Sequence, residues 1–205
     1  MLGETGPGGG KVFYYSAAGF NCGTSFTSAG SPTGGLCHYL EHAAAGWDGT
    51  ALDPYMYWSA NMTTSVGATS TEIGSGFMNS ELMRINSGTL YHNDGTPYAG
   101  AYIRSKTLGG KSDWYLPSKD ELNQLCKWAR DLPATTPSTP CDGTAGTASN
   151  IQSSGAGNAM TGWVADHYWS SSERAPSEAH SRDFRGNTYY YGKIWRFIVR
   201  PIRSF

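Results

Sequence analysis

The chain has 205 residues and a formal net charge of −1, which allows one domain with a sizeable core. Only 15% of the residues are charged, 13% are aromatic and 27 are glycines, a composition that disfavours a disordered chain and a coiled coil. The near-zero charge gives no field for nucleic acid, and no apolar run approaches the roughly 20 residues of a membrane-spanning helix. We therefore expect a single domain over residues 1–205, with no cofactor, no nucleic-acid partner and no membrane insertion.

We expect no signal peptide within these residues, because Met1 and Leu2 lead directly into a Gly/Pro-rich turn. We expect the chain to be the C-terminal part of a longer protein. Residues 11–15 (Lys-Val-Phe-Tyr-Tyr) then predict a strand, and the Gly-, Ser- and Thr-rich residues 20–36 predict a loop.

Two helices are predicted in the middle of the chain, over residues 76–86 and 98–106. In the first, apolar side chains follow the i, i+4, i+7 pattern of a buried helical face. They are Met78, Leu82 and Ile85.

The clearest helix signal begins at Ser118, where Glu121 completes an S-x-x-E capping box, and the helix is predicted over 118–131. One face is apolar, and Pro133 ends the helix. That face consists of Leu122, Leu125, Cys126 and Ala129. Residues 133–161, with almost no large side chain, predict a long loop of the kind that is often functional.

Four cysteines occur as two neighbouring pairs, and the members of each pair lie 15 positions apart. The even number favours two disulfides in an oxidising setting, although four cysteines allow three pairings and buried free thiols are an alternative. The candidate pairs are Cys22–Cys37 and Cys126–Cys141.

Residues 38–42 (His-Tyr-Leu-Glu-His) fit the H-x-x-E-H signature of inverted zinc proteases. On a helix the two histidines would share a face and bind Zn²⁺, with Glu41 as the general base. The window has no third ligand supported by a motif, and it fits a strand equally well. Because so short a pattern has many false positives, we favour a structural segment without metal and expect no enzyme.

The tail from Tyr168 onward carries the strongest functional signal. Residues 174–196 are rich in Arg, Ser, His, Asp, Asn and Tyr, and several of these types supply rigid contact area and adaptable hydrogen bonds in antibody paratopes. Strands are predicted over 164–169, 188–191 and 195–202. The three consecutive tyrosines of the second strand must alternate between its faces, so at least one points to solvent or a partner.

The predicted ligand contacts lie in this tail, with Tyr and Trp as anchors and Arg as the charged partner. They are Tyr168, Arg174, His180, Ser181, Asp183, Arg185, Asn187, Tyr189, Tyr190, Tyr191 and Trp195. The expected core combines the apolar face of the 118–131 helix with large side chains elsewhere. These are Trp114, Leu116, Trp169, Phe184, Phe197 and Val199.

Five blocks of the sequence, in order, resemble the Lcl C-terminal-domain-like family. The most specific is Gly-Gly-Lys-Ser-Asp-Trp-Tyr-Leu-Pro-Ser-Lys-Asp-Glu-Leu at 109–122. The others are residues 3–15, Cys-His-Tyr-Leu-Glu-His-Ala at 37–43, Tyr-Trp-Ser-Ser-Ser-Glu at 168–173 and Val-Arg-Pro-Ile-Arg at 199–203.

The resemblance implies an α+β, C-type-lectin-like fold with a small twisted antiparallel sheet, two main helices, long loops and neighbouring termini. Members of the family act as ligand-binding tips of bacterial adhesins and viral receptor-binding proteins. We therefore expect a protein or glycan receptor as partner and an extracellular-facing position on a virion or cell surface. The Glu-Pro-Asn and Trp-Asn-Asp motifs of calcium-dependent lectins do not occur in the sequence, which argues against calcium-mediated sugar binding.

Some such domains resemble the variable proteins of diversity-generating retroelements, in which adenines of a template are miscopied and Asn codons scatter. Residues 174–197 lie where that variation falls, and only Glu178, Lys193 and Trp195 among them cannot be reached from an Asn codon. The segment is therefore the expected hypervariable binding segment. The alternatives are a fixed-specificity glycan adhesin, an oxidase similar to formylglycine-generating enzymes, and a homo-oligomeric fibre subunit.

Overall fold

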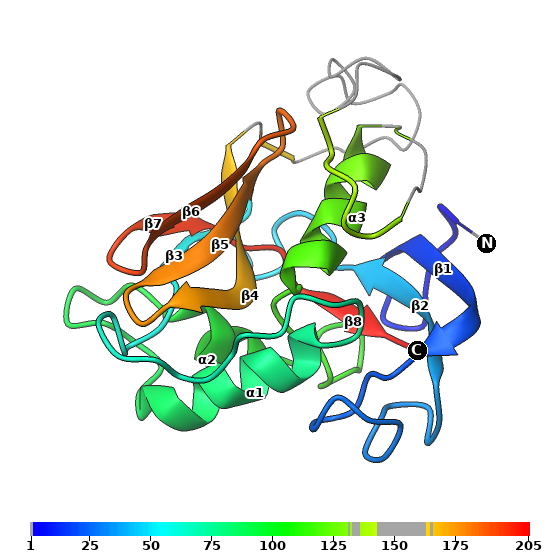
Figure 1. The fold of residues 1–205 in the computed structure, drawn as a ribbon, viewed down its shortest axis with the longest axis horizontal. Coiled ribbons are helices and arrows are strands. Elements are labelled where there is room, and N and C mark those ends of the chain that lie inside the picture. Colours follow the sequence, from blue (N-terminus) through cyan, green and yellow to red (C-terminus); the bar gives the residue numbers. More distant parts are fainter. Residues whose placement is uncertain (1, 131, 133–135, 143–162, 165) are drawn as a thin grey trace.

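The computed structural model describes residues 2–130, 132, 136–142, 163–164 and 166–205, and within them the chain forms two sheets and three helices (Figure 1). The expected α+β class is confirmed. The predicted 133–161 loop lies outside the described residues apart from 136–142, which hold turns and bends.

The strands are β1 Lys11–Phe20, β2 Cys37–His42, β3 Tyr55–Tyr57, β4 His167–Ala175, β5 Glu178–Asp183, β6 Thr188–Gly192, β7 Arg196–Ile198 and β8 Ile202–Ser204. One sheet has the order β1-β2-β8, and the other has the order β3-β7-β4-β5-β6. All neighbouring strands are antiparallel except β4 and β7, which are parallel. The prediction of one antiparallel sheet is therefore corrected to two sheets, one of them mixed.

The predicted strand 195–202 divides into β7 and β8 because Pro201 has no N–H for a continuous ladder. The residues between them cross from one sheet to the other. Within this crossing Arg200 is buried, and its Nε donates to Asp53 Oδ2 at 2.5 Å. Pro201 O accepts a hydrogen bond from Ala43 N at 2.9 Å, so the crossing is tied to the end of β2.

The helices are α1 Gly76–Ser87, α2 Ala99–Arg104 and α3 Lys119–Ala129. The last two lie within their predicted ranges, and α1 extends one residue past its predicted end. None of these helices is long and apolar enough to cross a membrane. At α3 the capping box is present: Ser118 Oγ accepts from Glu121 N at 3.3 Å, and Glu121 Oε2 accepts from Ser118 N at 2.7 Å. The predicted apolar face of α3 is buried in the core.

The predicted face of α1 is correct only in part. Leu82 packs against the core, but Ile85 is 64% exposed, while Phe77, Ser80 and Met83 are buried. Ser80 Oγ bonds both the backbone N and O of Leu116, at 2.9 and 3.3 Å, so a polar residue takes a core position at little cost. Helical spacing alone therefore placed Ile85 on the buried face, where the structure has Phe77, Ser80 and Met83.

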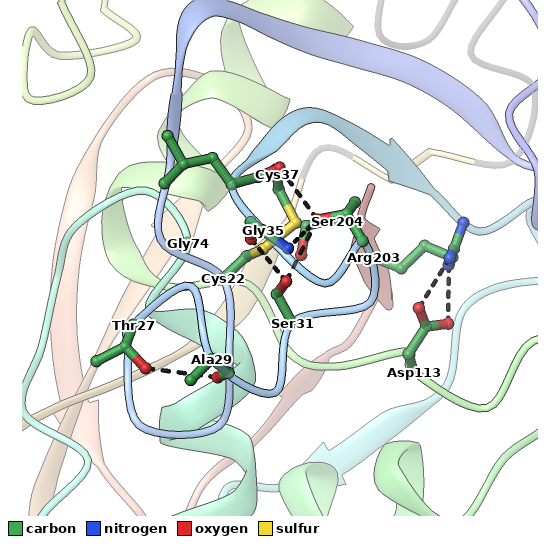
Figure 2. The surroundings of a disulfide bond; sticks show 12 residues. Cys22, Thr27, Ala29, Ser31, Gly35, Cys37, Gly74, Asp113, Arg203 and Ser204 are labelled. Carbon is green, nitrogen blue, oxygen red and sulfur yellow. Dashed lines mark hydrogen bonds and ion pairs between the residues drawn. A yellow bond between two sulfur atoms is a disulfide. The ribbon is translucent and has the colours of Figure 1, made fainter.

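Both expected disulfides are present, Cys22–Cys37 and Cys126–Cys141. The first closes the 20–36 loop beside the hydrogen bond from Ser31 Oγ to Gly35 O, 2.6 Å long (Figure 2). The second joins the buried face of α3 to the end of the described 136–142 segment.

The H-x-x-E-H window lies on β2 and not on a helix. At roughly 3.3 Å per residue, His38 and His42 are about 13 Å apart, too far to share one Zn²⁺ with bonds of about 2 Å. Glu41 Oε1 accepts from Gly8 N at 2.8 Å and from Arg203 Nη1 at 2.6 Å. This geometry contradicts the zinc hypothesis and gives Glu41 a structural role.

Replacing Cys126 and Cys141 together by serine is expected to lower the free energy of unfolding by about 3 kcal/mol, because the bond closes a loop of 15 residues. Urea unfolding followed by tryptophan fluorescence measures the change. The Cys22→Ser/Cys37→Ser variant is the matched comparison, with the same loop length and a similar expected loss. Losses below about 1 kcal/mol in both variants would contradict this account of the disulfides.

Because His42 is buried, its contribution to stability is expected to fall as the pH is lowered. Burial and the nearby charge of Arg200 lower its pKa to about 3, whereas an unfolded histidine titrates near 6.5. Between these values only the unfolded chain takes up the proton, so this group removes about 1.4 kcal/mol of stability per pH unit on acidification. Unfolding free energies of wild type and His42→Phe are measured at pH 7 and pH 5. The difference between the two proteins isolates the contribution of His42 and should change by about 2 kcal/mol between these pH values.

Candidate functional site

The three consecutive tyrosines of β6 alternate as expected. The register pairs Tyr189 with Ser181 and Tyr191 with Ala179 on one face of the sheet, and Tyr190 with His180 on the other.

A cluster of partly exposed rings covers the first of these faces, and we call it the tyrosine face: His167, Tyr189, Tyr191 and Phe197. The ring centroid of His167 is 5.0 Å from those of Tyr189 and Tyr191 and 5.1 Å from that of Phe197. Tyr191 and Phe197 meet edge to face at 4.9 Å. Mutual contact holds each ring in place, which gives this face a defined shape.

The turn between β6 and β7 adds two large exposed side chains. Ile194 is 59% exposed and Trp195 is 57% exposed. Trp195 N donates to Gly192 O at 3.0 Å, which closes the turn beside Tyr191. Exposed apolar side chains of this size, next to a ring cluster, are typical of binding surfaces.

The opposite face of β6 is more polar. The guanidinium of Arg174 lies 3.5 Å from the ring centroid of Tyr190 and forms an ion pair with Glu178. His180 lies half-buried on the same face, and burial, with the charges of Lys119 and Arg174, lowers its pKa.

A buried ion pair fixes the β6–β7 turn to the rest of the domain. The side chains of Lys193 and Glu173 are 0% and 1% exposed. The ammonium has three acceptors: Glu173 Oε1, Thr64 O and Pro176 O. The carboxylate accepts three further hydrogen bonds of 2.5–3.1 Å from residues 65–67. All donors of the pair are therefore used, which is the condition for a tolerable buried pair.

The structure brings most of the predicted contacts to the surface. Six are exposed and two are partly exposed. The exposed residues are Arg174, Arg185, Asn187, Tyr189, Tyr190 and Trp195, and the partly exposed ones are His180 and Tyr191.

Three predicted contacts are corrected because they are buried. Tyr168 stacks on Phe184 with centroids 4.4 Å apart, and burial raises its pKa. Ser181 lies beside Tyr189 in the sheet and is 2% exposed. Asp183 Oδ1 accepts from Arg185 N at 2.9 Å inside the β5–β6 turn. These three residues support the surface and are not part of it.

Sequence reasoning missed His167, Ile194 and Phe197 as members of the surface. Phe197 was assigned to the core, yet it is only partly buried. An isoleucine in an otherwise polar turn was the one available signal for Ile194. The places of His167 and Phe197 on this surface depend on sheet register, which sequence spacing does not show.

An open groove of about 670 Å³ lies apart from this surface, between α1 and α2. Glu81 bonds Arg84 at 2.8 Å and Arg104 at 2.5 Å along it, so its charges are largely paired. Among the described residues no group of three or more His, Cys, Asp and Glu side chains could hold a metal ion.

The variant Lys193→Met is expected to lose about 3–5 kcal/mol of unfolding free energy, because Glu173 would keep an uncompensated buried charge. Chemical denaturation measures the loss. The matched control is Arg174→Met, which breaks a partly exposed ion pair with Glu178 and should cost less than about 1 kcal/mol. Equal losses in the two variants would argue against the anchoring role of the buried pair.

A family model and a solved structure are similar to this chain. The model of the Lcl C-terminal domain matches residues 84–203, which is more than half of the chain and includes the 109–122 block and the tail. The structure of a fimbrial protein from Bacteroides ovatus is similar to this chain, with a TM-score of 0.47 and 16% sequence identity. The alignment covers 96% of this chain and 44% of the fimbrial protein, so this chain spans less than half the length of that protein. A comparison with curated proteins yields no match. The chain belongs to the Lcl C-terminal domain family.

Proposed function

We propose that the chain is a ligand- or receptor-binding module that displays the tyrosine face and the Ile194–Trp195 turn on a rigid scaffold. The observation that carries the proposal is the exposure of these large side chains on a hairpin anchored by the buried Lys193–Glu173 pair. Tyr and Trp are enriched among the residues that contribute most to binding. A surface already held in its bound shape loses little entropy on association.

The same module is proposed to face the outside of a cell or virion, with a C-type-lectin-like fold and a protein or glycan receptor as partner. All four cysteines form disulfides, which supports an oxidising location. Because all four cysteines are paired, none is left as a reactive thiol. A formylglycine-type oxidase needs reactive thiols, so the pairing favours the binding role over that oxidase.

Retroelement diversification of residues 174–197 is a further part of the proposal. Most positions of residues 185–196 are exposed, and Lys193, one of three residues outside the Asn-codon set, is the buried anchor. A near-duplicate of the 3′ end that differs only at adenines, beside a reverse-transcriptase gene, is expected in the neighbouring DNA. Its absence would indicate a module of fixed specificity.

Binding is tested in two ways. The chain in solution is applied to a glycan array, and a phage library of random nine-residue peptides is selected on the immobilised chain. Variants Tyr191→Ala and Trp195→Ala are each expected to weaken the selected ligand at least tenfold, or about 1.4 kcal/mol. Ile85→Ala, on an exposed side chain of α1, is the control and should leave affinity unchanged. Ligands whose affinity is equal in all of these variants would place the binding site elsewhere.

A further inference from the structure

Strand β6 is the edge of the five-stranded sheet (Figure 1). Its side chains are exposed or partly exposed along its whole length. One edge pairs with β5 in an unbroken register of five residue pairs. Within the described part of the chain no strand or isolated bridge pairs with the other edge.

The backbone groups that point outward from this edge can be assigned. Asp183 N donates to Asn187 O at 3.0 Å, so these two residues form a hydrogen-bonded position of the ladder. Hydrogen-bonded and non-bonded pairs alternate in an antiparallel ladder, which directs the N–H and C=O of Tyr189 and Tyr191 toward β5. The N–H and C=O groups of Thr188 and Tyr190 therefore point away from the sheet.

This edge lacks the usual protection against pairing. Strand β6 has the sequence Thr-Tyr-Tyr-Tyr-Gly, with no charged residue, no proline and no bulge in its register. Its side chains are already held by contacts within the chain: Tyr191 by the tyrosine face and Tyr190 by Arg174. The strand is thus ordered before any partner arrives, while its outer main-chain groups lack a partner among the described residues.

One exposed cation lies at an end of β6. The Arg185 side chain, 70% exposed, precedes the strand, and its Nη1 is 3.9 Å from the carboxylate of Asp183. Arg196 lies on β7, which β4 and β5 separate from β6. An acidic residue near the Arg185 end of an added strand would be complementary to it.

We propose that an extended segment of a partner protein adds to the free edge of β6 as a sixth strand. The proposal rests on the binding function above and names its partner class. Main-chain hydrogen bonds to Thr188 and Tyr190 supply the affinity, and alternate side chains of the added segment contact the tyrosine face and the Arg174–Tyr190 face. A glycan has no repeating N–H and C=O groups at strand spacing, so the edge fits a polypeptide.

The substitution Tyr190→Pro tests the edge directly. The N–H of Tyr190 points outward, so proline removes a donor to the added strand without removing a bond to β5. Tyr190→Ala is the matched control, since it loses the same ring and keeps the N–H. The probes are synthetic nine-residue peptides selected from the phage library, measured by fluorescence anisotropy.

Wild type and Tyr190→Ala are expected to bind the selected peptides, and Tyr190→Pro is expected to bind them at least tenfold more weakly than Tyr190→Ala. Amide exchange followed by NMR should show Thr188 and Tyr190 becoming protected in the complex, while Tyr189 and Tyr191 are protected before and after. If proline disturbs the β5–β6 ladder, peptides methylated on alternate backbone nitrogens replace it as the test. Methylation on the nitrogens that face β6 should abolish binding, and methylation on the others should not.

Peptide binding that is equal in the proline and alanine variants, or equal for both methylation patterns, overturns strand addition. Glycan binding with no selected peptides also overturns it. The proposed binding function survives either result if affinity still depends on Trp195, and it fails if no ligand depends on Trp195 or Tyr191.

Discussion

The buried ion pair between Lys193 and Glu173 is the contact on which the geometry of the candidate surface depends. Taking both charges out of water costs several kcal/mol for each ion, and this cost is offset only when every hydrogen-bonding group finds a partner. Here the ammonium has its three acceptors, and the carboxylate also binds residues 65–67. The turn that carries Trp195 cannot shift without breaking several of these bonds together.

A second anchor holds the other end of β6. Gly186, in the β5–β6 turn, has φ +122°, and a Cβ there would lie 2.3 Å from Arg130 Nη1 and 2.7 Å from Cys141 O. Only glycine fits this turn against the end of α3 and the Cys126–Cys141 disulfide. Strand β6 is therefore held at both ends by buried contacts, while its own side chains face solvent. This explains how a segment with so much exposed surface keeps a regular strand.

Local signals in the sequence predicted the helices and the cysteine pairs well. The capping box at Ser118 and Glu121 is a contact between residues three positions apart, so spacing reveals it. Strands β3 and β5 were not predicted from the sequence. Strand β3 has only three residues, and β5 (Glu-Ala-His-Ser-Arg-Asp) is polar in sequence yet mostly buried. Its Arg182 bonds Gly186 O and Thr188 Oγ1, partners that only the folded hairpin brings together.

The same difference between local contacts and contacts formed only on folding applies to the candidate binding surface. Composition identified a segment with the character of a paratope, but register and burial decide which of its residues face outward. Tyr168 and Ser181 are residue types typical of the displayed positions, yet both are buried, and they lie on opposite faces of the sheet. Tyr168 stacks on Phe184, whereas Ser181 lies beside Tyr189 and is covered on that face. Sequence therefore located the surface, and the sheet determined its members.

The proposed recognition through the main chain of β6 would have a consequence for the proposed variability of residues 174–197. The N–H and C=O groups of an edge strand are the same whatever side chains it carries, so affinity from the main chain survives substitution at exposed positions. Side chains such as Tyr189 and Tyr191 then alter which partner segment fits, without removing the hydrogen bonds that hold it. Diversification of buried positions such as Ser181 or Lys193 would instead act on stability, since each is packed or paired inside the domain. An edge strand anchored at both ends thus separates the residues that select a partner from the groups that bind it, which is the property a variable receptor-binding module requires.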